Sequence, residues 1–260
     1  MKKVLVVLSG GQDSVTCLFW AVQKFGMEAV RAVAFNYGQK HAIELKSAEK
    51  VSRLAGVPFE VVAVPGILRG SSPLTNPDVE LEKYENFEQM EKTIGNRVEL
   101  TFVPMRNAFF LTLAANYAIA NGIRTLVTGV CGEDNANYPD CRQQFISAQE
   151  LTINLALGIQ DFEILTPLMY LSKAETVQLA LETPGAYSAL AHSHTSYDGQ
   201  YPPTDNNHSN VLRAQGFLAA GIPDPLVLRA NAEGLMELPL TPNYAADLVR
   251  GARELMADFA

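Results

Sequence analysis

The 260-residue sequence predicts an α/β protein with a parallel five-stranded sheet, helices on both faces and a small C-terminal appendage. Short apolar runs without alternation, such as residues 4–8, are typical of parallel strands that are buried on both faces. These runs alternate with segments of helical periodicity, as they do in consecutive βαβ units. Polar loops follow several of the runs, and parallel sheets bind their ligands at the carboxyl ends of strands.

Each element is predicted from its own pattern of apolar residues and from the Gly and Pro residues that end it. The expected strands are 4–8, 28–35, 59–64, 125–129 and 162–165. The expected helices are about 15–24, 42–54, 107–120 and 143–157, with one more that contains Lys173. This order predicts a domain over residues 1–185 and a loop-rich, helical appendage over 186–260.

Two segments lie outside this alternation. Residues from about 70 to 100 are rich in Asp and Glu and show little apolar periodicity, so we predict an acidic insertion without regular structure. It is interpreted either as a mobile cover over the site or, for 78–96, as a solvated segment without ligand contact. The tail after Pro242 has apolar spacing that fits an amphipathic helix, which either closes the core or forms an oligomer.

Composition limits the function. The formal charge of −8 and the isoelectric point near 5.1 argue against a broad nucleic-acid surface, so no direct nucleic-acid binding is expected. No apolar stretch is long enough to span a membrane, and a soluble, cytoplasmic protein is expected. The three cysteines provide neither a disulfide framework nor a paired Cys-x-x-Cys motif, and Cys17 is expected to be a small buried residue.

The loop Ser9-Gly10-Gly11-Gln12-Asp13-Ser14 is the densest motif in the chain. The two glycines permit a tight turn and let backbone N–H groups approach a ligand, and Ser14 is expected to cap the following helix. A strand, a turn and a helix N-terminus in line form a site for phosphate. No Gly-Lys-Ser or Gly-Lys-Thr closes the loop, which excludes an ordinary P-loop.

Several motifs occur together and in the order that they have in the QueC family of 7-cyano-7-deazaguanine synthases, which the chain resembles. They are 9–14 as given above, Tyr37-Gly38-Gln39-Lys40-His41, Phe102-Val103-Pro104-Met105-Arg106-Asn107, Gly129-Val130-Cys131, Tyr138-Pro139-Asp140-Cys141-Arg142, Thr166-Pro167-Leu168-Met169, Lys173-Ala174-Glu175 and Leu212-Arg213-Ala214-Gln215-Gly216-Phe217. The resemblance covers about residues 3–182 and resumes at 212–217.

The resemblance implies an adenine-nucleotide alpha-hydrolase-like (Rossmann-like) fold and an ATP pyrophosphatase loop at 9–14. It also implies an ATP-dependent ligase of queuosine biosynthesis that releases AMP and pyrophosphate. The substrates would be 7-carboxy-7-deazaguanine and ammonia, the product 7-cyano-7-deazaguanine (preQ0), and the intermediate an amide. ATP and Mg²⁺ are the expected cofactors, and a homodimer is the expected assembly.

Site roles follow from the same resemblance. Asp13 would position the loop or Mg²⁺, and Lys173 and Arg106 would contact phosphates or the acyl adenylate, although ordinary surface ion pairs remain the alternative for the two cations. The expected nucleotide contacts are Leu8, Ser9, Gly10, Gly11, Gln12, Asp13, Ser14, Gln39, Lys40 and Gly129. The expected contacts to the deazaguanine substrate are Tyr37, Glu133, Asp134, Tyr138, Asp140 and Arg142.

The family's four-cysteine zinc site is replaced in this chain. Hydroxyl and amide groups cannot take the place of thiolates around zinc, so we expect no zinc and no other metal at these positions. The residues at the four positions are Ser196, Thr204, Asn207 and Asn210.

Three histidines near the replaced positions leave a second interpretation open. His192, His194 and His208 lie close in sequence to Asp198 and Asp205, so a rebuilt metal site of imidazoles and carboxylates is conceivable. Histidines in a polar loop are more often surface residues, which is the other interpretation.

Three functions compete with the nitrile synthase. A related ligase could join the activated deazaguanine acid to an amine on another molecule, including a protein of an antiviral defence system, and stop at the amide. A catalytically idle nucleotide sensor is the second alternative, and the intact residues 9–14 argue against it. A tRNA-thiolating enzyme is the third, and the acidic composition argues against its nucleic-acid surface.

Overall fold

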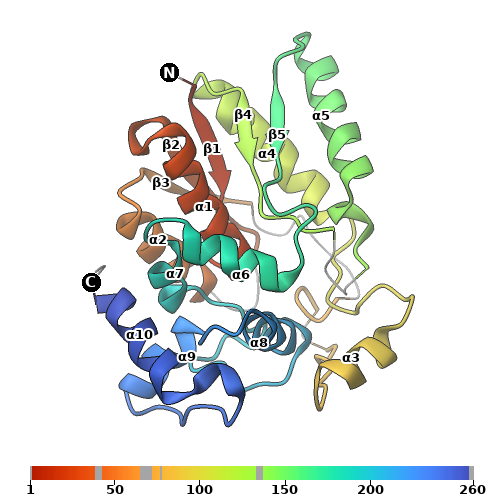
Figure 1. Cartoon of the computed structure of the whole chain (residues 1–260). Helices are drawn as coiled ribbons and strands as arrows, with labels where there is room; N and C mark the ends of the chain where they lie inside the picture. The colour runs from red at the N-terminus through yellow and green to blue at the C-terminus, as the bar shows by residue number, and fades with distance from the viewer. Residues whose placement is uncertain (1, 39–42, 65–71, 77, 133–136, 258–260) are drawn as a thin grey trace.

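A computed structural model describes residues 2–38, 43–64, 72–76, 78–132 and 137–257. Five parallel strands form one sheet, as predicted, and their order in it is β3-β2-β1-β4-β5 (Figure 1). Since β1 lies at the centre and the chain leaves it in both directions, the crevice at the carboxyl end of β1 is where such sheets bind ligands. The strands are β1 Val4–Val7, β2 Val30–Asn36, β3 Phe59–Ala63, β4 Thr125–Val127 and β5 Glu163–Leu165.

Helices cover both faces of the sheet (Figure 1). One face packs against α1 Gln12–Phe25, α2 Ile43–Leu54, α6 Lys173–Glu182 and α7 Ala186–Ala189, and the other against α4 Arg106–Ala120 and α5 Gln143–Leu157. Alternate residues of β1 supply the two cores: Val4 and Val6 face the first set of helices, and Leu5 faces the second. The predicted two-sided burial of this strand is therefore confirmed.

The C-terminal helices lie beyond the carboxyl ends of the strands, toward which the arrows point in Figure 1. They are α8 His208–Ala220, α9 Pro225–Ala232 and α10 Ala246–Ala257. Phe217, Leu228 and Val249 from these helices belong to the same core as β1 and α1. Hydrophobic contacts therefore cross the predicted boundary between residues 185 and 186, which remains a prediction.

The tail helix α10 turns Val249 and Ala252 toward the core, each 6% exposed, whereas Leu248 and Leu255 are 40% and 51% exposed. The helix therefore contributes to the core, although only some of its regularly spaced apolar residues are buried. In the part of the chain that the structure describes, no helix combines the length and the apolar character that a membrane span requires.

The acidic insertion contains a helix that the sequence did not predict, α3 Phe87–Ile94, and the expectation of no regular structure was wrong. Asn86 caps the helix by accepting a hydrogen bond from the backbone N–H of Gln89. Met90 and Ile94 are buried against Leu212 of α8. The helix has only eight residues, so packing against α8 rather than intrinsic propensity stabilises it.

Candidate functional site

The loop after β1 runs directly into α1, which begins three residues earlier than predicted. Gly11 occupies the N-cap position, and no side chain caps the helix there. The expected cap by Ser14 was wrong: the Ser14 hydroxyl lies inside the first turn, donates to the Gly11 carbonyl at 3.0 Å and accepts from the Gly10 N–H at 3.2 Å. The hydroxyl therefore braces the loop and leaves the helix N-terminus open to a ligand.

Two glycines allow backbone segments to approach one another beneath this loop. Gly10 has a φ of +88°, and a Cβ on it would lie 2.9 Å from the backbone nitrogen of Ala48 in α2. A Cβ on Gly129, after β4, would lie 2.9 Å from the backbone nitrogen of Ser14. Both positions therefore require glycine for packing. Together they hold the loop 9–14 between α2 and the end of β4.

Gln12 provides an independent sign of a ligand. Its side chain is 3% exposed and lines the pocket described below, and among the described residues neither its amide oxygen nor its amide nitrogen has a hydrogen-bond partner. Leaving such a group buried and unsatisfied is unfavourable. A bound molecule with both donors and acceptors, such as a nucleotide with its water shell, would satisfy it.

Asp13 and Lys173 meet across the site. The Lys173 ammonium lies 2.8 and 3.0 Å from the two carboxylate oxygens of Asp13, and both side chains are largely buried. Gly216 of α8 permits this geometry, because a Cβ there would overlap the Cγ of Lys173. The ammonium is thus held next to the α1 N-terminus, and the expected alternative of an ordinary surface pair does not describe this buried contact.

The C-terminal part of the chain supports the loop directly. The His194 backbone N–H donates to the Gly10 carbonyl at 2.8 Å. Arg213 holds this segment: it is 2% exposed, donates to the hydroxyls of Ser193 and Thr195 at 2.8 and 2.7 Å, and forms a buried ion pair with Asp224. The Leu-Arg-Ala-Gln-Gly-Phe motif therefore contributes a structural arginine to the site.

Arg106 enters the pocket from the start of α4, opposite α2. Met105, which precedes it, has a φ of 64° although it is not glycine, and this uncommon conformation sets where the helix and its first side chain begin. The Arg106 side chain hydrogen-bonds Tyr37 and lies in electrostatic reach of Glu44, Tyr138 and Asp140. The guanidinium therefore lies among phenol and carboxyl groups from the residue after β2, from α2 and from the loop before α5.

Glu44 is a carboxylate of the pocket that the sequence analysis did not select. Burial raises its pKa to about 7, although the Arg106 guanidinium acts to lower it. The charged and titratable groups that line the same pocket include Asp13, Lys173 and His194. At neutral pH this carboxyl group is therefore close to half protonated.

Replacing Glu44 with Gln should change how stability depends on pH. Since the pKa is raised in the folded state, the parent protein should lose free energy of unfolding relative to Glu44→Gln as the pH rises from about 4.5 to 7, and the difference should become constant above about pH 8. Urea unfolding of both proteins across this pH range measures the difference in their free energies of unfolding. A constant difference for Glu44→Gln across this range would show that the carboxyl is not perturbed.

The loop before α5 carries the predicted substrate contacts. Asp140 is buried and accepts a hydrogen bond from the Asn107 backbone N–H at 3.3 Å; burial raises its pKa, and this bond and Arg106 act to lower it. Asn107 also donates to the Asp140 carbonyl at 3.2 Å. The Phe-Val-Pro-Met-Arg-Asn motif thus holds the Tyr-Pro-Asp-Cys-Arg motif in place.

One pocket of about 310 Å³ joins these groups, a volume typical of small-molecule sites. Of the predicted residues it is lined by Leu8, Ser9, Gly11, Gln12, Asp13, Ser14, Tyr37, Arg106, Gly129, Tyr138 and Lys173. Gly10 and Asp140 support it from behind, and Arg142 is exposed and does not line it. Gln39, Lys40, Glu133 and Asp134 lie outside the described residues.

Residues that were missed come mainly from the C-terminal part of the chain and from α4. The pocket is also lined by Glu44, Leu74, Asn107, Phe110, His194, Thr195, Tyr197, His208, Ser209 and Leu212. Leu74 shows that the insertion reaches the pocket, whereas no described residue of 78–96 lines it. Asn107 and Leu212 stand inside quoted motifs and could have been selected. His194 and His208 were considered only as possible metal ligands, and nothing local in the sequence marks the others.

Three of the four replaced zinc positions form a hydrogen-bond network. The Ser196 hydroxyl accepts from the side-chain amides of Asn207 at 3.1 Å and Asn210 at 2.9 Å, and donates to Asp198 at 2.6 Å. Thr204 is exposed and outside this network. Hydrogen bonds thus connect the chain at three of the positions where the resemblance implies zinc ligands.

The three histidines do not gather around one point. His192 contacts Arg229, and burial together with this cation lowers its pKa to about 4, whereas His194 and His208 line the pocket. Among the residues that the structure describes, no group of three His, Cys, Asp or Glu side chains is arranged to hold a metal ion.

Replacing Asn207 with Ala should destabilise the protein by about 2 kcal/mol or more, because its buried side chain both caps α8 and bonds Ser196. Asn206→Ala is the matched control, since Asn206 is exposed and its described bond uses only the backbone carbonyl. Urea unfolding measures both. Equal stability of the two variants would contradict a structural role for the network.

Comparisons with known proteins agree on one family. A family model described as "Queuosine biosynthesis protein QueC" matches residues 3–221, which include every residue that lines the pocket. A protein of Chromobacterium violaceum named 7-cyano-7-deazaguanine synthase is 48% identical over 233 residues, or 89% of this chain and 96% of that protein. Proteins of the same name from Laribacter hongkongensis and Gloeobacter violaceus are 46% and 43% identical, covering 86% and 87% of this chain and 94% and 96% of theirs.

Among solved structures, the chain is similar to one described as a predicted subunit of tRNA methyltransferase from Methanocaldococcus jannaschii. The TM-score is 0.40 with 18% identity, over 70% of this chain and 75% of that one. A likeness this low carries no argument about the site.

Proposed function

Because the chain belongs to the QueC family, we propose that it is an ATP-using enzyme that converts 7-carboxy-7-deazaguanine and ammonia, through the amide, into 7-cyano-7-deazaguanine. The observation that supports this most is the pocket at the carboxyl end of β1, where an open helix N-terminus, the buried amide of Gln12 and the cations Lys173 and Arg106 meet. This set suits a reaction in which an anion leaves and an acyl group is activated.

The first step is the adenylation of the substrate carboxylate. The carboxylate oxygen attacks the α-phosphorus of ATP, and pyrophosphate departs with the electron pair of the broken P–O bond. The backbone N–H groups of Gly11 and Gln12 at the N-terminus of α1 would hold the pyrophosphate, and Lys173 would stabilise the charge that develops on the phosphate oxygens. The activated acyl group is then electrophilic enough for an amine to attack.

Asp13 is the residue that would hold Mg²⁺, since its carboxylate lies next to the proposed phosphate site and carboxylates and phosphates are preferred magnesium ligands. When bound, the ion neutralises charge on the phosphate oxygens. Asp13 is engaged by Lys173 in this structure, so its contacts would rearrange when nucleotide and metal bind.

The deazaguanine base would lie on the other side of the pocket, against Tyr37, Phe110 and Tyr138. Aromatic rings offer a platform for a planar base, and Arg106 between them can pair with the substrate carboxylate. Ammonia attacks the acyl adenylate and loses a proton, and the new C–N bond replaces the C–O bond to AMP. A second ATP then adenylates the amide oxygen with release of pyrophosphate. The nitrile forms as that oxygen leaves with AMP and the nitrogen loses its two protons.

Product analysis tests the proposal. The protein is incubated with 7-carboxy-7-deazaguanine, ATP, Mg²⁺ and ammonia, and the products are identified by mass spectrometry. Nitrile together with AMP is the expected result. Amide without nitrile, or a conjugate when other amines or proteins are added, would instead support the ligase alternative, and no substrate-dependent AMP would overturn both.

A further inference from the structure

The buried carboxylate of Glu99 connects the insertion to the loop before α5 that carries Tyr138. Glu99 is 2% exposed, and its Oε2 accepts hydrogen bonds from the Thr101 backbone N–H at 2.7 Å, from the Thr101 hydroxyl and from the Tyr138 hydroxyl at 3.2 Å. Among the described residues, no lysine or arginine forms an ion pair with it. Burying a carboxylate that has only neutral hydrogen-bond donors costs free energy of folding. A role for Glu99 in the adjacent pocket would account for that cost.

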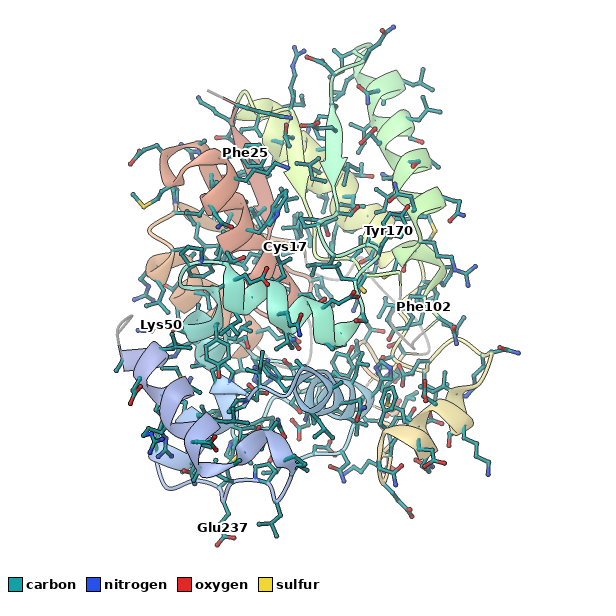
Figure 2. All side chains as sticks on the ribbon, in the orientation of Figure 1. Cys17, Phe25, Lys50, Phe102, Tyr170 and Glu237 are labelled. Carbon is teal, nitrogen blue, oxygen red and sulfur yellow. The ribbon has the colours of Figure 1, made fainter. Side chains whose placement is uncertain are left out.

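The loop that carries Tyr138 is fixed on the insertion. The Asn137 side-chain amide donates to the carbonyls of Gly95 at 2.9 Å and Arg97 at 3.0 Å, and the rings of Phe102 and Tyr138 lie 5.4 Å apart. Figure 2 shows Phe102 between α3 and the lower end of α5, where the insertion meets this loop. Tyr138 thus lines the pocket from a position that the insertion determines.

The direction of these hydrogen bonds decides what Tyr138 can offer to a ligand. A carboxylate only accepts, whereas a phenol carries one hydrogen and two lone pairs. The Thr101 hydroxyl contacts both Glu99 and Tyr138, so the single Tyr138 hydrogen is used inside this cluster, by Glu99 or by Thr101. Burial and the nearby Tyr197 and Glu99 raise the pKa of Tyr138, so the phenol keeps that hydrogen. Only lone pairs remain toward the pocket.

We propose that Glu99 is a positioning residue that makes the Tyr138 hydroxyl an acceptor for an N–H group of the deazaguanine base. The inference rests on the proposed function, and it assigns to the insertion a role in choosing the substrate. A guanine-like base carries N–H donors along one edge, whereas a ligand that presents only a carbonyl at this point would find no hydrogen.

Calorimetric binding of 7-carboxy-7-deazaguanine, together with KM for this acid and for ATP, tests the proposal. Glu99→Leu removes the acceptor, so that the Thr101 hydroxyl can donate to Tyr138 and the Tyr138 hydrogen is freed. The Kd and KM for the acid should therefore rise on the order of five- to tenfold, with KM for ATP unchanged. Tyr138→Phe should give a similar change. The double variant should be no weaker than Tyr138→Phe alone, because Glu99 acts through that hydroxyl.

Glu82→Gln is the matched control, since Glu82 pairs with Arg97 in the same insertion and does not contact Tyr138; it should leave all three constants unchanged. An unaltered Kd in Glu99→Leu, an equal rise in KM for ATP, or effects that multiply in the double variant would overturn the proposal. If Glu99→Leu does not fold, Glu99→Ala, which also removes the acceptor, is measured instead with the same expectations. If the parent protein turns over the acid and these variants bind it normally, only the role of Glu99 is refuted. If the parent protein does not bind the acid, the proposed function is refuted as well.

Discussion

Gly10→Ala should abolish ATP-dependent AMP formation and lower the free energy of unfolding by several kcal/mol. An alanine would have to adopt a φ of +88° and place its Cβ 2.9 Å from the Ala48 nitrogen and closer still to the Glu44 carbonyl oxygen. Both obstacles are backbone atoms, so no side chain can rotate to make room. The loop or α2 must therefore shift, and strain and overlap of this kind cost a few kcal/mol.

Gly26→Ala separates strain from overlap. Gly26 has nearly the same φ, +85°, but a Cβ there would meet nothing within 4 Å. This variant should lose about 1–3 kcal/mol through backbone strain alone, less than Gly10→Ala, and keep its rate of AMP formation. Urea unfolding and a substrate-dependent AMP assay measure both variants, and equal losses in the two would show that the close approach of Gly10 to α2 is not what the loop requires.

Lys173→Met should reduce AMP formation by a factor of about 10² to 10³, the size of effect seen when one preorganised contact to developing charge is removed. The ammonium is held within 3.0 Å of the Asp13 carboxylate and next to the α1 N-terminus, so it is already directed at the proposed phosphate site. Methionine keeps the length and the apolar stem of the side chain and removes only the charge.

The control for this variant is Lys83→Met, because Lys83 forms a more distant pair with Asp205 at 3.4 Å and its side chain is 70% exposed. Its rate of AMP formation should match that of the parent. Single-turnover measurements with saturating ATP separate the chemical step from binding. A Lys173→Met protein that forms AMP at the parent's rate would remove Lys173 from the reaction.

The sheet could be predicted because each strand is a local signal. A β-branched apolar run followed by a polar loop specifies a buried parallel strand without reference to the rest of the chain, and all five strands overlap their expected ranges. Helix starts were less certain: α1 begins at Gln12 because Gly11 provides the cap position that Ser14 was expected to provide. Helix α3 did have local signals, namely the cap at Asn86, apolar residues at 87, 90 and 94 and Gly95 after its end. The acidic composition around it led to the expectation of a loop.

Some residues of the pocket could be predicted from local sequence patterns and others could not. The residues that follow β1 and β4 could be predicted, because the carboxyl ends of neighbouring parallel strands must meet. Glu44 and His194 could not, because their place in the pocket depends on how α2 packs against Gly10 and on how Arg213 holds the segment 193–195. Contacts of that kind depend on tertiary packing, which no local pattern records.

The hydrogen bond from the His194 N–H to the Gly10 carbonyl has a consequence for biosynthesis. A ribosome makes the glycine-rich turn among the first residues of the chain and makes its brace nearly two hundred residues later. A nascent or prematurely terminated polypeptide therefore carries the whole glycine-rich sequence without the support that shapes it. We accordingly expect the turn to reach its folded shape only after residue 194 has been synthesised.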